Sequence, residues 1–264
     1  MPELPEVHTF DQYFRAAALH QRIQRVEVSD DHIIRNMDGA AFARRLAGRT
    51  FVDSLRRGKY LFARLDNGDD VLLHFGMTGD LQLYTDPAER PRFERLAFLF
   101  VNGERLAFED ARKFARILYL EDRDAYIAEK KLGPDALQLT EDGFLASLGQ
   151  RQTTIKAFLL NQQHVAGIGN LYADEICYRA RVHPASRVVA LPQDKRREIY
   201  RHLHEVMHQA VAELPHYRDY PEAWFWHTWR FTGATSPDGQ STVEKATIGG
   251  RTTYFFPGYQ RLYQ

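Results

Sequence analysis

The sequence of 264 residues predicts an α+β protein in three parts: an N-terminal β-sandwich with one leading helix, an all-helical second part and a C-terminal β-hairpin module. Two observations lead to this prediction. The hydrophobic pattern has a period of two over most of the first part and changes to a helical period near residue 137. Turns of the Asn-Gly type separate the predicted strands, as in antiparallel hairpins. We therefore place the three domains at 1–136, 137–222 and 223–264.

The first part opens with a helix, because the apolar residues Val7, Phe10, Phe14 and Ala17 recur at helical spacing. Alternating strands follow, and a run of antiparallel strands behind one helix favours a sandwich or barrel. A last helix stops at Gly133, with a proline after it, which marks a domain edge. The predicted strands cover residues 22–28, 59–65, 70–75, 96–101 and 105–110, with tight turns at 66–69 and 102–103.

The second and third parts differ from the first in their hydrophobic period. Helical patterns cover residues 144–149, 153–162, 171–182 and 194–214, and the last of these has Ile199, Leu203, Val206 and Val211 on one stripe. The final 42 or so residues, by contrast, are rich in aromatic side chains. They predict strands around residues 232–240 and a tight turn at Gly249 and Gly250.

Composition excludes several classes of protein. The 35 basic residues balance the 35 acidic ones, so any anion-binding surface is local. A single cysteine, Cys177, excludes an internal disulfide and a cysteine-rich metal site. No apolar stretch is long enough for a membrane span, and the N-terminus lacks a secretion signal. We therefore expect a cytoplasmic or nucleoid-associated protein with no membrane partner.

The opening "MPELPEV" has a chemical meaning beyond helix initiation. Removal of Met1 would leave a secondary amine at Pro2 with the carboxylate of Glu3 next to it. An α-amino group has a pKa of roughly 8, so a useful fraction is a neutral nucleophile near pH 7. The alternative is that proline and glutamate only begin a helix, where both are common.

Several motifs together resemble the bifunctional DNA glycosylase/AP lyases of the formamidopyrimidine-DNA glycosylase and endonuclease VIII type. They stand in the family's order along nearly the whole chain, and the ordered set is far more specific than any one of them. The resemblance implies a catalytic β-sandwich, a helix-two-turn-helix domain and a C-terminal finger. The motifs are "MPELPEV", "GKYL" at 58–61, "LLHFGMTG" at 72–79, "EDARKFA" at 109–115, "LGPDAL" at 132–137, "GIGNLYADEI" at 167–176, "HP" at 183–184 and "GGRTTYFFPGYQ" at 249–260.

The resemblance implies roles for four residues in catalysis. Pro2 would be the nucleophile that attacks the sugar C1′ and forms a Schiff base, and Glu3 would be the general acid and base. Glu6 would support the terminal amine or the sugar. Lys59 would contact the phosphate beside the lesion; without the motif it would be an ordinary lysine at a strand start.

The resemblance also implies a DNA-binding surface. An enzyme that extrudes a base must fill the vacated stack, and Met77, Arg112 and Phe114 match the family's residues for that task, with Lys113 between the last two. Outside the family context Met77 and Phe114 would more often be core residues. A second group would hold the backbone: Lys156, Gly169 after Gly167, Asn170 as the cap of the next helix, and Arg251.

The C-terminal module departs from the family pattern. Most members bind zinc there through four cysteines, but the positions matched from Arg251 are Ser236, Gly239, Phe256 and Tyr259. We therefore predict a zincless finger, with no metal and no small-molecule cofactor. A metal-free module needs another source of cohesion. An aromatic core is the first candidate, formed by Trp224, Trp226, Trp229, Phe231, Tyr254, Phe255, Phe256 and Tyr259.

Two further departures concern the lesion. The segment 214–231 is short compared with the branch of the family that folds a loop over oxidised guanine, and His8 replaces a usual acid. The sequence does not distinguish between four candidate substrates: oxidised pyrimidines, ring-opened purines, hydantoins and abasic sites.

The predicted function is base excision from duplex DNA followed by β,δ-elimination, by a monomeric enzyme. One alternative is a non-catalytic binder of damaged or abasic DNA on the same scaffold, although such a binder has no use for an N-terminal amine. Another is an unrelated N-terminal-proline enzyme for small carbonyl compounds, which leaves the phosphate-binding motifs unexplained.

Overall fold

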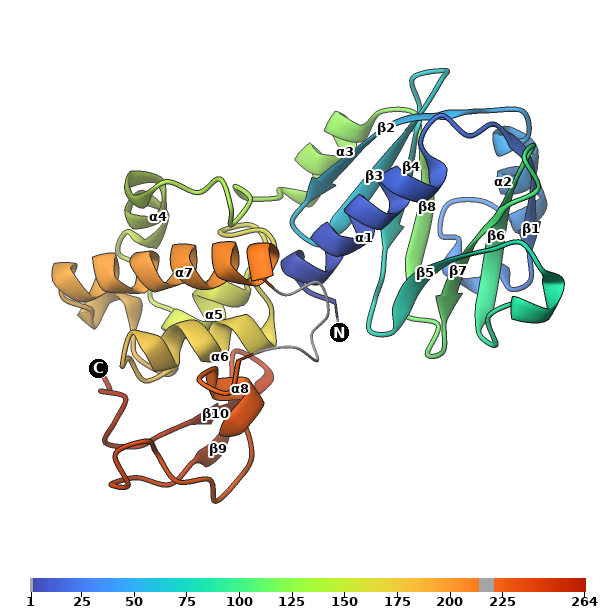
Figure 1. The fold of residues 1–264 in the computed structure, drawn as a ribbon. Coiled ribbons are helices and arrows are strands. Elements are labelled where there is room, and N and C mark those ends of the chain that lie inside the picture. The colour runs from blue at the N-terminus through green and yellow to red at the C-terminus, as the bar shows by residue number, and fades with distance from the viewer. Residues whose placement is uncertain (1, 214–220) are drawn as a thin grey trace. The chain divides into compact units, whose positions relative to one another are not determined.

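The computed structural model describes residues 2–213 and 221–264. The chain forms two compact units, Met1–Lys131 and Leu132–Gln264 (Figure 1). The finer division into three domains, with bounds at 136 and 222, stays a prediction. The predicted short segment of 214–231 falls partly on residues 214–220, which lie outside the described residues.

Two four-stranded antiparallel sheets form the first unit and confirm the predicted sandwich. Their strand orders are β1-β6-β7-β5 and β2-β3-β4-β8. Both sheets contribute to one buried apolar core, with Phe51 and Leu61 from the second sheet and Phe98 and Phe108 from the first. The strands are β1 (Ile23–Val28), β2 (Phe51–Arg57), β3 (Tyr60–Leu65), β4 (Asp70–His74), β5 (Gly79–Tyr84), β6 (Glu94–Phe100), β7 (Arg105–Asp110) and β8 (Arg116–Leu120).

Helix α1 (Leu4–Ala18) closes an open side of the sandwich. It contacts β2, β3 and β5, and β2 and β5 are edge strands of the two different sheets. Its predicted apolar stripe is confirmed: Val7 and Phe14 are buried, and Phe10 packs on Phe75 with 4.3 Å between ring centroids. A second helix, α2 (Gly39–Leu46), contacts β1.

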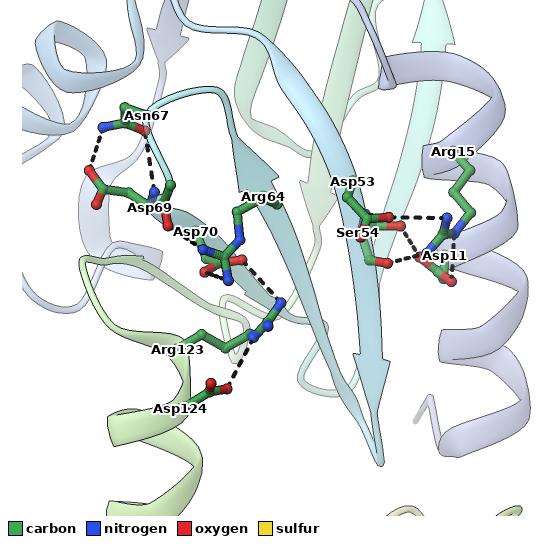
Figure 2. A network of polar contacts seen from close by, with 11 residues as sticks. Asp11, Arg15, Asp53, Ser54, Arg64, Asn67, Asp69, Asp70, Arg123 and Asp124 are labelled. Atoms are coloured by element: carbon green, nitrogen blue, oxygen red, sulfur yellow. Dashed lines mark hydrogen bonds and ion pairs between the residues drawn. The ribbon is translucent and has the colours of Figure 1, made fainter.

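A polar network fixes α1 to strand β2, as Figure 2 shows. The buried Asp11 carboxylate accepts a hydrogen bond from Ser54 Oγ, and Arg15 Nε donates to its other oxygen at 3.2 Å. Arg15 also lies 3.4 Å from Asp53 Oδ1 and donates to the Ser54 carbonyl. Helix α1 follows the N-terminus, and β2 leads into the turn that contains Lys59. The network therefore holds the N-terminus and this turn in a fixed relative position.

A second network joins helix α3 (Arg123–Lys130) to the sheet (Figure 2). The carboxylate of the buried Asp70 lies 3.1 Å from Arg64 Nη2 and 3.7 Å from Arg123 Nη1. Burial raises the pKa of Asp70, while both guanidinium groups act in the opposite direction. Helix α3 thereby covers the outer face of the second sheet, where Tyr126 packs on a small apolar cluster around Phe62.

The predicted end of α3 at Gly133 is wrong. The helix ends at Lys130, and Lys131 takes the left-handed conformation with φ of 52° and caps it through its own N–H. Gly133 has another role, because a Cβ there would lie 2.7 Å from the Gln163 carbonyl oxygen. The glycine therefore permits a close backbone approach in the second unit and does not stop the helix.

Helices form the core of the second unit. They are α4 (Glu141–Leu148), α5 (Ile155–Leu160), α6 (Asn170–Arg179) and α7 (Gln193–Glu213). Residues 172–178 of α6 are all buried, since α5, α7, a short helix α8 (Phe225–Thr228) and strand β10 (Arg251–Phe255) all contact it. Cys177 lies in this stretch, and burial raises the pKa of its thiol to about 12. On α7, Met207 and Ala210 are buried, whereas the predicted Val211 is only half-buried.

The C-terminal hairpin consists of β9 (Glu244–Ile248) and β10, joined at Gly249 and Gly250 as predicted. Strands were wrongly predicted around 232–240, and the aromatic-rich stretch before it contains α8. The predicted aromatic core is confirmed for Trp229, Tyr254, Phe256 and Tyr259, which pack together with Phe225 and Tyr178. Phe231 does not belong to it, because 58% of its surface is exposed.

Within residues 2–213 and 221–264, we find no helix that combines the length and the apolar character needed to cross a membrane.

Candidate functional site

The first turn of α1 is ordered around its acidic residues. Glu3 is 1% exposed and lies at the N-cap, and its backbone N–H donates to Glu6 Oε2 at 2.8 Å. This capping box fixes the direction in which the chain enters the helix. Pro2, half-buried, precedes it directly. The predicted nucleophile and acid are therefore the two residues that lead into a rigid helix.

Lys59 and His74 lie close together on the second sheet. Lys59 and Gly58, with φ of 55°, connect β2 and β3, and His74 ends β4. Gly76 N–H donates to His74 Nδ1 at 3.2 Å, which leaves the ring proton on Nε2. Burial, with the charges of Arg116 and Lys59, lowers the pKa of His74 to about 4. This neutral histidine lies inside the motif 72–79, but no local sequence signal predicts its burial or its neutral state.

The structure brings Met77, Arg112 and Phe114 together on two adjoining loops. Met77 and Phe114 are 37% and 49% exposed, which excludes the alternative that they are core residues. The Arg112 guanidinium lies 4.9 Å from the centroid of the Phe114 ring. Gly76 has φ of 60°, and a Cβ there would lie 2.5 Å from the Phe114 carbonyl carbon. Only glycine lets the two loops touch.

A buried carboxylate joins these two loops. Asp110, fully buried, accepts hydrogen bonds from Thr78 Oγ1, from Arg112 N at 3.2 Å and from Ala115 N at 2.8 Å. Hydrogen bonds to a charged acceptor are stronger than neutral ones. Asp110 therefore fixes both exposed loops. It lies in the motif 109–115, but nothing in the sequence predicts this role.

Lys113 has a partner within its own unit. Its backbone is left-handed, with φ of 58°, and its Nζ lies 2.6 Å from Asp30 Oδ2. The hydrogen bond from Lys113 contributes most to the lowered pKa of Asp30. A DNA contact by Lys113 stays a prediction, and it would compete with this ion pair.

The predicted cap of α6 is off by one residue. Gly169, with extended backbone at φ −124° and ψ −158°, is the N-cap, and Asn170 is the first helical residue. The Asn170 side chain does not cap the helix, because its Nδ2 donates to the Thr252 carbonyl of β10 at 2.9 Å. Asn170 is thus joined to the hairpin, while Gly167, with φ of 115°, shapes the preceding turn.

Lys156, predicted to add a charge to the group that holds the DNA backbone, is buried. Its side chain is 0% exposed, and its Nζ lies 2.5 Å from Asp174 Oδ1 and donates to Thr253 Oγ1 at 2.7 Å. A lysine is buried only when its charge is paired. The ammonium group is therefore directed into the second unit and away from solvent.

Arg251 is exposed at the first position of β10. The turn before it contains Gly249 and Gly250, with φ of 60° and 71°, as a two-residue type I′ hairpin requires. A Cβ on Gly249 would lie 3.1 Å from Ala157 Cα of α5. The turn thus packs on α5, so the start of β10 is fixed while the arginine side chain points outward.

The four positions matched to zinc ligands do not fit a zinc ion. Phe256 is part of the aromatic cluster, Gly239 has no side chain, and Ser236 Oγ donates to Asp238 Oδ1 at 2.5 Å. Zinc sites need thiolate, imidazole or carboxylate ligands. Within the described part of the chain, no three His, Cys, Asp or Glu side chains gather in a way that could hold a metal ion.

The structure combines a β-sandwich unit with a helical unit that ends in a β-hairpin, and comparisons with known proteins identify the family of this two-unit protein. Residues 1–117 match the formamidopyrimidine-DNA glycosylase N-terminal domain, and residues 132–216 match the H2TH domain of the same family. The formamidopyrimidine-DNA glycosylase of Arabidopsis thaliana is 31% identical over 280 residues, covering 100% of this chain and 72% of that protein. That of Solibacter usitatus is 32% identical over 270 residues, covering 99% and 100%.

Solved structures agree with this result. The Lactococcus lactis formamidopyrimidine-DNA glycosylase, non-covalently bound to DNA with an AP site, has a TM-score of 0.88 and 26% identity, covering 98% of this chain and 99% of that one. A MutM structure in complex with DNA containing carbocyclic 8-oxo-G has a TM-score of 0.87 at 26% identity, covering 98% and 100%.

The chain belongs to the formamidopyrimidine-DNA glycosylase family. It is a base-excision-repair DNA glycosylase that also has AP lyase activity.

Proposed function

We propose that the enzyme removes a damaged base from duplex DNA through a Schiff base on Pro2. The Pro2 nitrogen attacks the sugar C1′, the bond to the base breaks, and the base leaves with the proton that the Pro2 nitrogen gives up. Glu3 protonates the sugar ring oxygen, and ring opening yields the iminium ion. Loss of a C2′ proton then expels the 3′ phosphate, and a second elimination expels the 5′ phosphate. The observation that supports this most directly is the buried Glu3 next to Pro2 at a capped helix start.

The residues of the two units divide the remaining tasks. Lys59 contacts the phosphate beside the lesion, and Glu6 supports the terminal amine. Met77, Arg112 and Phe114 occupy the space that the extruded base leaves, which explains why two apolar side chains are exposed on a well-ordered pair of loops. Asn170 and Arg251 hold the backbone of the DNA.

The proposed substrate is duplex DNA with an abasic site or a damaged base, bound by one copy of the chain. Related structures contain DNA with an AP site, with Fapy-dG, and with carbocyclic 8-oxo-G. Abasic DNA is the intermediate common to all base-excision reactions, so it is the substrate for a first test. The enzyme would act at the nucleoid in the cytoplasm, where its substrate lies.

Borohydride trapping on a duplex with one abasic site tests the proposal. The protein with a free Pro2 should form a covalent adduct, and an N-terminal extension that turns the amine into an amide should abolish it while leaving DNA binding intact. Glu3→Gln should lose more activity on a damaged base than on the abasic site, because an abasic sugar opens without base release. Glu129→Gln, exposed on α3, is the matched control. Tight binding without any adduct would mean that Pro2 does not form the proposed Schiff base.

A further inference from the structure

Three charged residues meet where α5, α6 and the hairpin module come together. The carboxylate of Asp174, 0% exposed on α6, has Oδ1 at 2.5 Å from Lys156 Nζ and Oδ2 at 3.1 Å from Arg230 Nε. Lys156 Nζ also donates to Thr253 Oγ1 of β10 at 2.7 Å. One carboxylate therefore joins three segments that are far apart in the sequence. We call these four residues the Asp174 cluster.

The loss of a single charged group from the Asp174 cluster should be strongly destabilising. Burial raises the pKa of Asp174 and lowers that of Lys156, and the ion pairs act against both effects. Removing one member of a buried ion pair costs far more than the pair contributes, because the other charge stays buried without a partner. Without the carboxylate of Asp174, two cations would face each other.

The cluster acts on the part of the hairpin that carries Arg251. Thr253 bonds to Lys156, the Thr252 carbonyl accepts from Asn170 Nδ2, and the Arg230 guanidinium lies 4.9 Å from the centroid of the Tyr254 ring. The contacts to three consecutive residues of β10 fix its register on α6. They therefore also fix the distance between Arg251 and Asn170.

We propose that Asp174 and Arg230 are positioning residues that set the register of β10 on α6, so that Arg251 and Asn170 present one phosphate-binding surface. The aromatic cluster around Phe256 holds the module together, and the Asp174 cluster sets the position of the module on the helices. This inference rests on the proposed contacts of Arg251 and Asn170 with the DNA backbone.

Asp174→Asn and Arg230→Met test the inference, with two measurements. Hydrogen exchange should speed up about tenfold in residues 251–255, because the ties that close β10 onto α6 are lost. The Kd for an abasic duplex should rise about tenfold, and the slope of log K against log salt should fall by about one phosphate contact, or about 0.9. The single-turnover rate at saturating enzyme should stay within about twofold, since the reacting groups are untouched. Arg230→Lys, which keeps the charge, should recover part of the affinity.

Arg196→Met is the matched control for a loss of stability alone. Arg196 is buried in the same unit, and its guanidinium donates to the Leu191, Val188 and Gly149 carbonyls, none of them in the hairpin. This variant should lower stability without changing exchange in β10 or the salt slope. If Asp174→Asn does not fold, Arg230→Met carries the test, since that side chain is 20% exposed.

Two results would overturn the inference: unchanged exchange in residues 251–255 of Asp174→Asn or Arg230→Met, or faster exchange with unchanged affinity and salt slope. The variant Arg251→Ala distinguishes a failure of this positioning role from a failure of the proposed contact with the DNA backbone. If Arg251→Ala itself binds abasic DNA like the wild type, the proposed backbone contact is wrong, whatever the cluster variants do.

Discussion

The β-sandwich and the C-terminal hairpin module keep their exposed functional candidates in place by different means. In the sandwich, two sheets and two helices share one large apolar core, and the loops with Met77 and Phe114 extend from its strands. In the described residues, the hairpin module has an aromatic cluster around Phe256, and Lys156 and Asp174 join it to the helices through buried polar contacts. Small modules bury too little apolar surface to be stable on that basis alone. We therefore expect the loss of one buried contact to affect the position of the hairpin module more than that of a strand in the sandwich.

Truncating one core aromatic in each region should give the largest effects and the clearest contrast. Phe98→Ala removes a buried ring that packs edge-on against Phe51 and should lower the free energy of unfolding by about 3–5 kcal/mol. Phe256→Ala should mainly open the hairpin module. All three tryptophans lie at residues 224–229, and Trp224 packs on Tyr172 of α6, so their fluorescence reports on the module and its contact with α6, whereas circular dichroism reports on the whole chain.

We expect urea titrations of Phe98→Ala to shift the circular dichroism midpoint, and those of Phe256→Ala to shift chiefly the fluorescence midpoint. Val101→Ala, 66% exposed, is the control and should stay within about 0.5 kcal/mol of the wild type. Equal shifts of both signals in both variants would mean that the sandwich and the hairpin module unfold together. The proposed difference in how the two regions are stabilised would then be wrong.

A pH experiment sharpens the contrast through His74 in the sandwich. Its pKa falls from an ordinary 6.5 to about 4 in the folded protein, so between these values the unfolded chain binds more protons. Stability should therefore be complete well above pH 6.5 and decrease as the pH falls toward 4, by about 2.5 kcal/mol at pH 4.5. His74→Gln should lose this part of the pH dependence in urea titrations at pH 7.5 and 4.5. An identical pH dependence in both proteins would contradict a neutral His74.

The smallest expected effect compares the two glycines of the hairpin turn. Alanine at Gly249 or Gly250 forces an L-residue into positive φ and should cost about 1 kcal/mol at either position. Only at Gly249 does the added Cβ meet another element, Ala157 of α5, whereas Gly250 faces open space. Fluorescence-monitored urea titrations should therefore find Gly249→Ala the less stable of the two. Equal stabilities would mean that the turn does not rest on α5.

Local signals in the sequence predicted much of the fold, and tertiary contacts decided the rest. The hairpins at 66–69 and 102–103 were predicted correctly because the Asn-Gly turn is encoded by neighbouring residues. The burial of Lys156 could not be predicted, because a lysine on a helix is usually exposed and its partner Asp174 is eighteen residues away. Gly169 and Asn170 can both cap a helix, so only the backbone angles distinguish them.

The candidate site shows the same limit. Motif resemblance found Pro2, Glu3 and the exposed loop residues, whose roles stay proposals. It did not find Asp110, because nothing local shows that one buried carboxylate bonds two loops. It also did not show that His74 is neutral, which depends on burial and on the nearby charges of Arg116 and Lys59.

The buried Cys177 has a consequence for the conditions under which such an enzyme works. Only a thiolate reacts readily with peroxide, and a thiol with a pKa of about 12 is almost fully protonated at neutral pH. Its side chain is also shielded from solvent, at 1% exposure, and it is the one cysteine in the chain. The oxidants that damage DNA bases therefore find no reactive sulfhydryl here, and a hairpin module without cysteine ligands offers them no metal thiolate to attack.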